Sequence, residues 1–286
     1  MQQGRTGLPV AVVIGGSGGM GQSCARRLAQ RHAVVLASRD VSKSEQVAVD
    51  LRREGAVAHP IACDITEPAS VAAMVEQASA LSPDGRVQTL AVVAGLSPSM
   101  ADWDRILTVN LAGTATVVEA VLPVIASGGV AVLVSSLAGH NRAADPAMLA
   151  VLDDPLAADL PKRAAAALGR DLTTVEAYGF SKLGEIRMAR RLVTRWAERG
   201  ARIVSLSPGL IQTPMGALEF TKQPMKFDLL RRTPLAREGM LTEICDALEF
   251  LCSDRASFIT GTDLLVDGGI ASALEFDLAA PVMPQP

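Results

Sequence analysis

Short, continuously apolar runs alternate along the chain with longer stretches in which apolar residues recur every three or four positions. Seven runs of the first kind occur, at residues 9–15, 33–39, 56–62, 90–95, 130–136, 201–207 and 263–269. They are rich in valine and do not alternate between apolar and polar positions, as is typical of strands buried on both faces. The intervening stretches, for example residues 21–31 and 71–81, have the periodicity of helices.

This order of elements predicts an α/β fold of the Rossmann type, a doubly wound parallel sheet of seven strands with helices on both faces. We find no linker and no internal repeat, so we expect one domain over residues 1–286. Residues 139–173 do not fit the alternation: they contain helix-forming sequence and two Asp-Pro turns, at Asp145 and Asp154. Because a structureless connection of this length would be unusual, we expect a folded insertion with one or two short helices.

The composition is that of a globular protein, with 49% hydrophobic and 20% charged residues. A net charge of −3 gives no basic surface for nucleic acid and no polybasic patch for a membrane. No apolar run approaches the roughly 20 residues that a membrane span needs. The first apolar run is interrupted by glycines and is not followed by a small-residue cleavage site, so we expect no secretion signal.

The cysteines and histidines indicate no metal site. Cys24, Cys63, Cys245 and Cys252 lie far apart in the sequence or within helix-like stretches, and no metal-binding spacing occurs among them. The three histidines form no cluster. We therefore expect no bound metal, small buried cysteines and a reducing, cytoplasmic location.

A glycine-rich segment, "VVIGGSGGMGQSCARRLAQ", follows the first predicted strand and opens a helix. Gly15, Gly19 and Gly21 stand where the chain must turn tightly and approach a ligand without an intervening Cβ. The helix N-terminus adds unpaired N–H groups and the positive end of a dipole. This context predicts a dinucleotide pyrophosphate site, and the alternative is a flexible turn that binds nothing.

The end of the second strand, "VVLASRD", bears on the choice of dinucleotide. NAD selectivity usually comes from a carboxylate at this strand end, which bonds the ribose 2′-hydroxyl. Ser38 stands at that position and Arg39 follows, a pair that can accept a 2′-phosphate. We therefore favour NADP(H). If the loop is displaced by one or two residues, the Asp40 carboxylate would favour NAD(H) instead.

The only tyrosine of the chain, Tyr178, precedes Lys182 by one helical turn in "AYGFSK". Most tyrosines fill cores or interfaces, which is the plain alternative here. A free phenol titrates near ~10 and is a poor base at neutral pH, and a neighbouring ammonium lowers that value. The pair can therefore give and take a proton during the reduction of a carbonyl or the oxidation of an alcohol.

Together the G-x-x-x-G-x-G spacing, "LVSSLAG", "ILTVNLAGT" and "YGFSK" resemble the short-chain dehydrogenase/reductase family over residues 9–270. The resemblance implies that Asn110, Ser136, Tyr178 and Lys182 are catalytic. In that pattern Ser136 donates a hydrogen bond to the substrate oxygen and Asn110 anchors a water. Lys182 lowers the pKa of Tyr178 and holds the nicotinamide ribose.

The resemblance also implies a set of cofactor-binding residues. In "CDIT", Asp64 would meet the adenine amine and Ile65 would pack on the ring, although Asp64 or Thr66 could equally cap a helix. "SPGLIQTPM" stands where the family contacts the nicotinamide carboxamide. The implied cofactor residues are Gly15, Ser17, Gly18, Gly19, Met20, Gly21, Ser38, Arg39, Asp64, Ile65, Ala94, Gly95, Tyr178, Lys182, Pro208, Gly209, Ile211 and Thr213.

Three features depart from the family pattern. Ile14 stands where a threonine is usual, and "VVAG" replaces N-N-A-G after the fourth strand, where we expect a structural change rather than a lost reaction. Between Ser136 and Tyr178 lie 41 residues, against roughly a dozen in the family, an extension that loops tolerate cheaply. This insertion, with "VAGLSP" and "DGGI", resembles the 3α-hydroxysteroid dehydrogenase/carbonyl reductase branch.

The insertion and residues 213–237 could cover the substrate. The second segment is rich in apolar, adaptable side chains, and we expect it to be a lid over a bulky hydrophobic, steroid- or terpenoid-like alcohol or ketone. The alternatives are another carbonyl, such as a 3-oxoacyl thioester or a sugar, and a sensor that binds NADP(H) without turnover. The family is commonly tetrameric, so we expect a homo-dimer or homo-tetramer. The segment holds Met215, Leu218, Phe220, Met225, Phe227 and Leu229.

Overall fold

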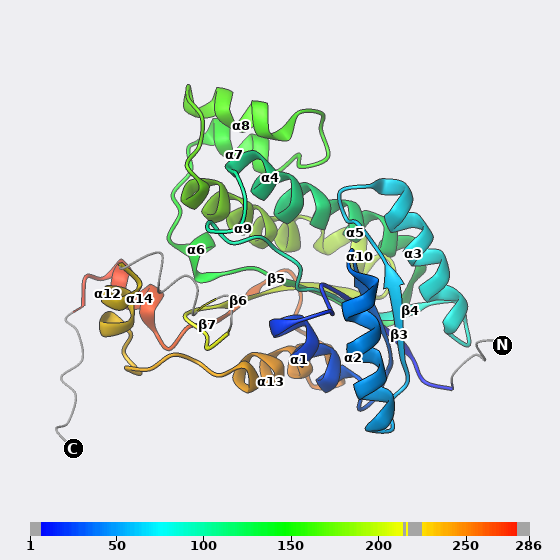
Figure 1. Ribbon diagram of the computed structural model, residues 1–286. Helices are drawn as coiled ribbons and strands as arrows, with labels where there is room; N and C mark the ends of the chain where they lie inside the picture. Colours follow the sequence, from blue (N-terminus) through cyan, green and yellow to red (C-terminus); the bar gives the residue numbers. More distant parts are fainter. Residues whose placement is uncertain (1–6, 214–215, 217–224, 279–286) are drawn as a thin grey trace, which may run out of the picture.

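Seven parallel strands form one sheet in the order β3-β2-β1-β4-β5-β6-β7 (Figure 1). The computed structural model describes residues 7–213, 216 and 225–278. The sheet order reverses between β1 and β4, and ligands of such sheets bind at the carboxyl ends of the strands beside the reversal. The strands are β1 (Val10–Ile14), β2 (Ala33–Ser38), β3 (Ala58–Ala62), β4 (Val87–Val92), β5 (Ile125–Val134), β6 (Arg202–Pro208) and β7 (Asp263–Val266).

All seven predicted strands are present, which confirms the predicted α/β fold. Two of them begin earlier than the apolar runs indicate, β4 at Val87 and β5 at Ile125. The early part of β5 contains a polar and glycine segment, residues 127–129, that hides the strand from a search for apolar runs. The β4–β5 register shifts between Val87 and Thr89, which accommodates this irregular start.

Helices cover both faces of the sheet. They are α1 (Gly19–Leu28), α2 (Val41–Arg53), α3 (Pro68–Leu81), α4 (Trp103–Leu107), the π-helix η1 (Thr108–Gly113), α5 (Thr114–Val121), the 3-10 helix η2 (Leu122–Val124), α6 (Leu137–His140), α7 (Pro146–Leu152), α8 (Leu160–Leu168), α9 (Thr174–Arg191), α10 (Val193–Ala197), α12 (Met225–Arg232), α13 (Leu241–Cys252), the 3-10 helix η3 (Asp254–Ala256) and α14 (Ile270–Glu275).

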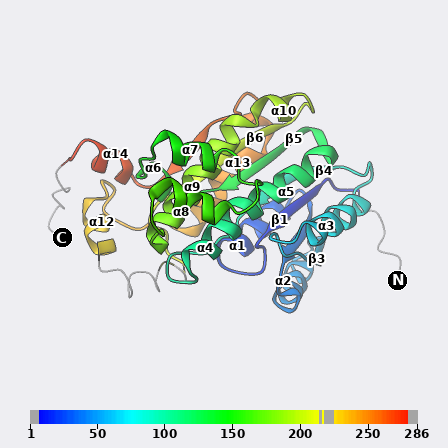
Figure 2. The same ribbon diagram turned by 90° about the horizontal axis from the view of Figure 1, so that it is seen from above.

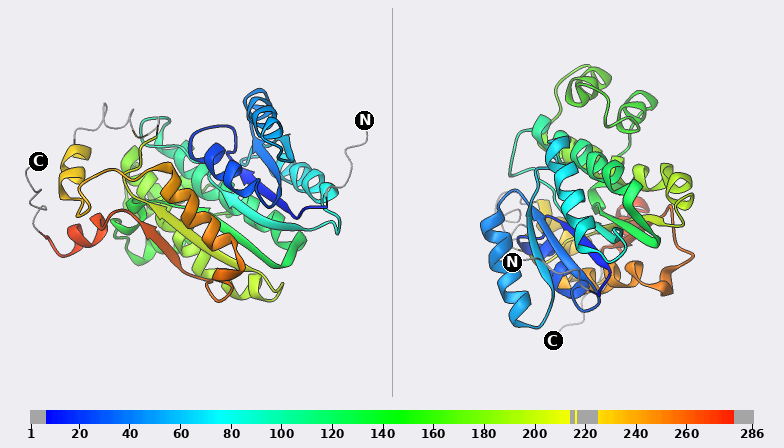
Figure 3. Two further views of the ribbon diagram at one scale, coloured as in Figure 1. Left: turned by 90° about the horizontal axis from the view of Figure 1, so that it is seen from below. Right: turned by 90° about the vertical axis from the view of Figure 1, so that its right-hand side faces the viewer.

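Successive residues of a strand enter two different apolar cores. Val10 and Val12 of β1 pack into the core that includes α3, α5 and α9, whereas Ala11 and Val13 pack into the core that includes α1, α2 and α13. Figure 1 shows α4 and α9 above the sheet, and the view from below in Figure 3 shows α1 and α13 across its other face. Burial on both faces explains why the strand sequences are continuously apolar.

One helical run among the described residues, Trp103–Val124, is long and apolar enough to cross a membrane by length and composition alone. Polar residues such as Thr108 and Asn110 interrupt its apolar sequence without ending the helix, so it is not the continuous apolar run that the expectation concerned. Of its most apolar window, 67% is buried inside the protein, where α5 contacts α3, and α4 and η1 contact α9. This burial is that of a core helix.

The insertion before Tyr178 is folded, as predicted, and holds α7 and α8. The Asp145-Pro146 pair starts α7 rather than forming a separate turn: the Asp145 carboxylate accepts the N–H of Met148 at 2.8 Å, and proline occupies the first helical turn. The two helices contact each other, α7 contacts α9, and α8 contacts α4 and η1. Figures 1 and 2 show α7 and α8 stacked on the α4–α9 layer, on the side away from the sheet.

The insertion is held to α9 by charge as well as by apolar packing, in which the buried Met148 and Leu152 share a core with Phe180 of α9. Asp153, the residue that ends α7, accepts two hydrogen bonds from Arg187 at 2.7 and 2.6 Å, and it also pairs with Arg191. Burial opposes ionisation of Asp153, but these arginines outweigh it and hold the pKa of the carboxyl below its usual value. The insertion therefore docks on the outer face of α9 instead of standing free.

Cys24 and Cys245, which lie far apart in the sequence, meet in the fold. Their Sγ atoms are 4.0 Å apart where α1 contacts α13, and both thiols are buried and free. Both belong to the apolar core on that face of the sheet. They act there as small apolar residues, as the composition predicts.

Candidate active site

The glycine loop between β1 and α1 is shaped as its sequence requires. Gly15 has φ +84° and donates its N–H to Ala37 of β2 at 2.8 Å. A Cβ on Gly21 would lie 2.0 Å from the carbonyl oxygen of Gly15, so α1 approaches the loop more closely than any side chain allows. Gly18 and Gly19 have no atom within 4 Å of their Cβ positions, which leaves an open cradle at the start of α1. Such a cradle fits a pyrophosphate.

At the end of β2, Ser38 and Asp40 are engaged by the protein itself. The Ser38 hydroxyl donates to the carbonyl of Asp40 at 3.0 Å and shares a 2.7 Å hydrogen bond with Ser44. The Asp40 carboxylate caps α2 by accepting the N–H of Lys43 at 3.1 Å, and the Lys43 ammonium lies 3.4 Å away. The hydrogen bond from the Lys43 backbone is the main cause that keeps the pKa of Asp40 below its usual value. Arg39, between them, is exposed.

The "CDIT" segment after β3 is a turn that precedes α3. The N-cap position of α3 is Glu67, whose side chain makes no capping hydrogen bond. The Asp64 carboxylate accepts the backbone N–H of Thr66 at 3.0 Å and its hydroxyl at 2.7 Å. Burial opposes ionisation of Asp64, but these bonds and the charge of Arg39 lower its pKa. Ile65 is 6% exposed and packs against Gly113, so little of its side chain is available to cover an adenine ring.

The "VVAG" segment after β4 keeps the sheet joined without the asparagine of the family pattern. The backbone N–H groups of Val93 and Ala94 both donate to the carbonyl of Ile14, at 3.0 and 2.9 Å. A Cβ on Gly15 would lie only 2.8 Å from the nitrogen of Ala94. The ends of β1 and β4 are therefore joined by backbone hydrogen bonds.

Asn110 lies in the π-helix η1 and is fully buried. Its side-chain oxygen accepts the N–H of Leu96 at 2.8 Å, and its amide group donates to the carbonyl of Leu96 at 3.0 Å and to Ser181 at 3.3 Å. The side chain thus ties the loop after β4 to α9. Short π-helical turns inside α-helices occur frequently at functional sites.

The two serines at the end of β5 have different surroundings. The Ser135 hydroxyl is buried and donates to the backbone carbonyl of Lys182 at 2.8 Å, which fastens β5 to α9. The Ser136 hydroxyl accepts the N–H of Ala138 at 3.1 Å and so caps α6. A Cβ on Gly139 would lie 2.8 Å from the backbone of Lys182, so α6 presses directly on α9 beside Ser136.

Tyr178 and Lys182 lie on α9, whose start is firmly defined. The Thr173 hydroxyl accepts the N–H of Glu176, and the Glu176 carboxylate accepts the N–H of Thr173, a capping box. The Arg170 guanidinium donates two hydrogen bonds to the same carboxylate, at 3.0 and 2.7 Å. The Arg170 bonds are the main cause that lowers the pKa of Glu176 to about 2. The helix therefore presents Tyr178 from its first turns at a fixed angle.

The predicted catalytic groups converge at the carboxyl end of the sheet. The Nζ atom of Lys182 lies 5.9 Å from the centre of the Tyr178 ring. A Cβ on Gly95 would lie 3.5 Å from Lys182 Nζ and 3.6 Å from Asn110 Oδ1, so these two side chains flank the same glycine. Ser136 stands at the start of α6, and α6 contacts the helix α9 that carries Tyr178 and Lys182. One buried ammonium and one phenol from α9, and two polar side chains from η1 and from the end of β5, thus come from three separate parts of the fold.

Glu185 is a residue that the sequence analysis missed. Both of its carboxylate oxygens accept hydrogen bonds from Lys182 Nζ at 2.9 Å, and the ammonium donates its third to the carbonyl of Val134 at 2.9 Å. The two side chains are 4% and 2% exposed. The i, i+3 spacing of the pair is visible in the sequence, but such pairs usually lie on solvated helix faces.

The segment after β6 is packed closely against the loop after β7. A Cβ on Gly209 would lie 2.6 Å from the Cα of Asp267, whose carboxylate accepts the N–H groups of Gly269 and Ala271, each at 2.8 Å. The Thr213 hydroxyl accepts the N–H of residue 216 at 2.8 Å. Of the expected lid, Met215, Leu218 and Phe220 lie outside the described residues. Residues predicted to contact cofactor along this segment are Pro208, Gly209, Ile211 and Thr213.

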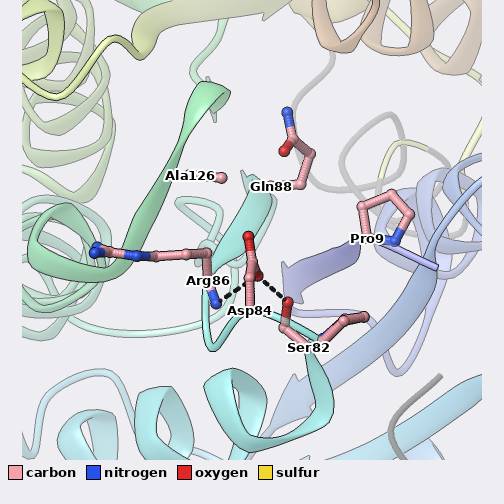
Figure 4. Close-up of a pocket in the computed structure, with 7 residues that line it drawn as sticks. Pro9, Ser82, Asp84, Arg86, Gln88 and Ala126 are labelled. Atoms are coloured by element: carbon pink, nitrogen blue, oxygen red, sulfur yellow. Dashed lines mark hydrogen bonds between the residues drawn. The ribbon is translucent and has the colours of Figure 1, made fainter. Parts of the chain in front are cut away.

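A hollow of about 210 Å³ opens at the opposite, amino-terminal edge of the sheet (Figure 4). Its polar groups are already paired: the Asp84 carboxylate accepts from Ser82 at 2.6 Å and from the backbone of Arg86 at 3.0 Å. Ligands of open α/β sheets bind at the carboxyl ends of the strands, so this hollow is not the candidate site. Its lining residues are Pro9, Ser82, Pro83, Asp84, Arg86, Gln88 and Ala126.

Comparison with known proteins assigns this arrangement to a family. The family model described as short chain dehydrogenase matches residues 9–148, and the one described as enoyl-(acyl carrier protein) reductase matches residues 163–271. A short-chain dehydrogenase/reductase of Alternaria brassicicola, bsc3, is 35% identical over 277 residues, 94% of this chain and 98% of that protein. The chain belongs to the short-chain dehydrogenase/reductase family. It is an oxidoreductase of the class that acts on alcohols and carbonyls with NAD(P)(H).

Other relatives have different substrates in their names. The D-threitol dehydrogenase of Mycolicibacterium smegmatis is 30% identical over 269 residues, 91% of this chain and 92% of that protein. Among solved structures, gox2181 has a TM-score of 0.76 at 26% identity and covers 94% of this chain and 97% of its own. A 7α-hydroxysteroid dehydrogenase has a TM-score of 0.74 at 23% identity, with 93% and 95% covered, and is similar in fold.

Proposed function

We propose that this protein interconverts a secondary alcohol and a ketone by hydride transfer with NADP(H), and that Tyr178 is the acid and base. The observation that carries the proposal is the convergence of Asn110 and Lys182 on Gly95, beside the Tyr178 ring, at the carboxyl end of the sheet. When bound, the nicotinamide supplies or accepts the hydride. The remaining requirements, a proton and a hydrogen-bond donor for the substrate oxygen, fall to side chains of this chain.

Each group has a distinct role in the proposal. Tyr178 gives its phenolic proton to the substrate oxygen during reduction and takes it back during oxidation, and the Lys182 ammonium stabilises the phenolate. Ser136 donates a second hydrogen bond to the same oxygen. Both N–H donors of the Asn110 side chain are used within the protein, so a water held by this side chain would donate to its amide oxygen.

Several described features support NADP(H) over NAD(H). The Asp40 carboxylate is bonded to the backbone N–H and the ammonium of Lys43 at the start of α2. It is therefore already engaged and is not free to bind a ribose hydroxyl. Arg39 is exposed beside Ser38, and its positive charge helps to lower the pKa of Asp64 at the carboxyl edge of the sheet. A guanidinium at this edge can bind a 2′-phosphate with two hydrogen bonds. The open positions at Gly18 and Gly19 would receive the pyrophosphate.

A fluorescence titration with NADPH and NADH tests this preference. Wild-type protein should bind NADPH at least about tenfold more tightly, and Arg39→Ala should remove most of that advantage while NADH binding stays the same. Arg53→Ala, which removes an equally exposed charge at the far end of α2, is the matched control and should change neither affinity. Equal affinities of the wild type for both dinucleotides would refute the preference.

We further propose a bulky hydrophobic substrate of the steroid or terpenoid kind. The support is the apolar sequence of residues 213–237 and, within α12, a Phe227 side chain that is 52% exposed. A panel of steroid and terpenoid ketones should turn over with higher kcat/KM than small polyols such as D-threitol. The reverse order would refute the hydrophobic substrate and leave the reaction class intact. 3-Oxoacyl thioesters belong in the same panel.

The position of the insertion bears on assembly. We propose a homo-dimer or homo-tetramer in a reducing, cytoplasmic location, the latter supported by four free cysteines. Because α7 and α8 cover α4 and α9, two chains could pack through that layer only if the insertion formed part of the contact. Light scattering of wild-type protein gives the number of chains. A monomer at micromolar concentration would contradict the proposed assembly.

A further inference from the structure

Glu185, the buried partner of Lys182, has no role of its own in the proposed reaction. The Glu185 carboxylate is 2% exposed and receives two of the three hydrogen bonds of the Lys182 ammonium, at 2.9 Å each. Carboxylates buried to this extent are rare unless they are paired, and a buried pair adds little to stability compared with apolar residues of the same volume. Lys182 stands one helical turn and Glu185 about two turns from the proposed acid, Tyr178.

Further charged groups stand behind Glu185. On β7, the side chain of Asp263 is 2% exposed. One of its carboxylate oxygens accepts the hydroxyl of Ser207 at 2.9 Å, and the other lies 2.8 Å from His140 Nε2. Burial is the main cause that raises the pKa of Glu185 to about 7; the charge and hydrogen bonds of Lys182 oppose it, and the Asp263 charge adds to it. The groups acting on Glu185 are therefore Lys182 on its own helix and Asp263 on β7, with His140 on α6 beyond it.

The same carboxylate acts on Tyr178 through Lys182. An ammonium 5.9 Å from the Tyr178 ring centre favours the phenolate. A negative charge 2.9 Å from that ammonium cancels much of its field at the phenol. Above about pH 7 Glu185 carries this charge, so Lys182 stabilises the phenolate less than an unpaired lysine would.

We propose that Glu185 is a positioning residue that fixes the Lys182 ammonium beside Tyr178 and whose negative charge keeps Tyr178 in its protonated, proton-donating form to higher pH. This inference rests on the proposed function for its catalytic meaning. A protonated phenol is the form that reduces a ketone, whereas a phenolate is the form that accepts the proton of an alcohol. Glu185 therefore favours ketone reduction above about pH 7, where it carries its charge.

Because Tyr178 is the only tyrosine in the chain, its ionisation can be measured directly from the ultraviolet absorbance of tyrosinate. Relative to wild type, Glu185→Gln should move the midpoint of this titration down by roughly one pH unit, about a tenfold rise in phenolate fraction below the midpoint. Glu185→Asp, which keeps the charge, should lie closer to wild type than E185Q. Tyr178→Phe gives the blank.

Ser135→Ala is the matched control. It removes a buried hydrogen bond to the Lys182 backbone without changing any charge, so a merely structural disturbance near Lys182 would appear in it as well. Its midpoint should equal that of wild type. Glu185→Leu provides a second neutral variant in case E185Q does not fold, which circular dichroism reveals.

An unchanged or higher midpoint in a folded neutral variant, or an equal fall in Ser135→Ala, overturns the inference. The titration needs neither cofactor nor substrate, so its outcome is independent of the proposed function, which fails if wild-type protein reduces no ketone. In an active enzyme, kcat/KM for reduction falls at alkaline pH as Tyr178 loses its proton. This fall should occur about one pH unit lower in E185Q than in wild type. Coinciding profiles would contradict the catalytic part.

Discussion

Alanine substitutions at Gly21 and Gly18 test two different roles of glycine in this loop. Gly21 allows close packing of α1 against the loop, and Gly18 leaves space for a ligand. Alanine at Gly21 would place its Cβ 2.0 Å from the carbonyl oxygen of Gly15 and 2.7 Å from the carbonyl carbon, whereas non-bonded heavy atoms prefer about 3.5 Å. The loop would have to move by more than ~1 Å. Gly15 cannot yield easily, because it is bonded to Ala37 and lies against Ala94.

Such overpacking costs about 2–3 kcal/mol, or roughly 5–10 °C in the thermal midpoint of a domain of this size. Gly21→Ala should therefore melt early and bind NADPH poorly. Gly18→Ala meets no atom within 4 Å and adopts an extended φ of −179°, so it should lose less than about 1 kcal/mol. Its methyl group nevertheless enters the proposed pyrophosphate space and should weaken NADPH binding at least about tenfold.

Differential scanning fluorimetry and NADPH titration of both variants provide the test. If the thermal midpoint of Gly21→Ala equals that of wild type, α1 does not approach the loop as closely as described. If Gly18→Ala melts normally and binds NADPH as tightly as wild type, the open cradle is not the cofactor site.

Three further changes test the framework around the site. Thr173→Ala removes the hydroxyl that caps α9 and should cost about 1 kcal/mol in urea unfolding; an unchanged midpoint would show that the cap is not formed. Glu176 has its pKa lowered to about 2, below the unfolded value of about 4.3, so its stabilisation is present at neutral pH and lost as the pH falls between these values. The melting temperatures of wild type and Glu176→Gln should therefore converge in acid, and a constant difference would contradict this. Asp153→Asn weakens the bonds to Arg187 and should increase hydrogen exchange in α7 and α8, with about 1–2 kcal/mol lost; unchanged exchange would mean that other contacts hold the insertion.

Much of the fold follows from short-range patterns. Each β-strand buried on both faces leaves an unbroken apolar run, and the Tyr178–Lys182 spacing places both side chains on one helical face. The strand β5 begins earlier than its apolar run, because its first residues lie at an irregular register where glycines are tolerated. The family pattern adds Asn110 and Ser136, which no periodicity would single out.

Other features depend on contacts between distant parts of the chain. Whether a Lys–Glu pair is solvated or buried is decided by what packs over it, so the role of Glu185 is invisible in the sequence. The partner of Asn110 in the π-helix is the backbone of Leu96, which is 14 residues earlier. The insertion lies against α9 because Met148 and Leu152 join the core that contains Phe180, and because Asp153 meets Arg187, which is 34 residues later.

The central claim is that Tyr178 carries the proton in a reaction that this chain catalyses with a bound dinucleotide. Tyr178→Phe removes only the hydroxyl, and the most direct test is the single-turnover rate of ketone reduction with NADPH, beside an NADPH titration of the same variant. The account predicts unchanged NADPH affinity and a rate lower by about 10²–10⁴-fold. A variant that reduces the ketone at the wild-type rate would contradict it.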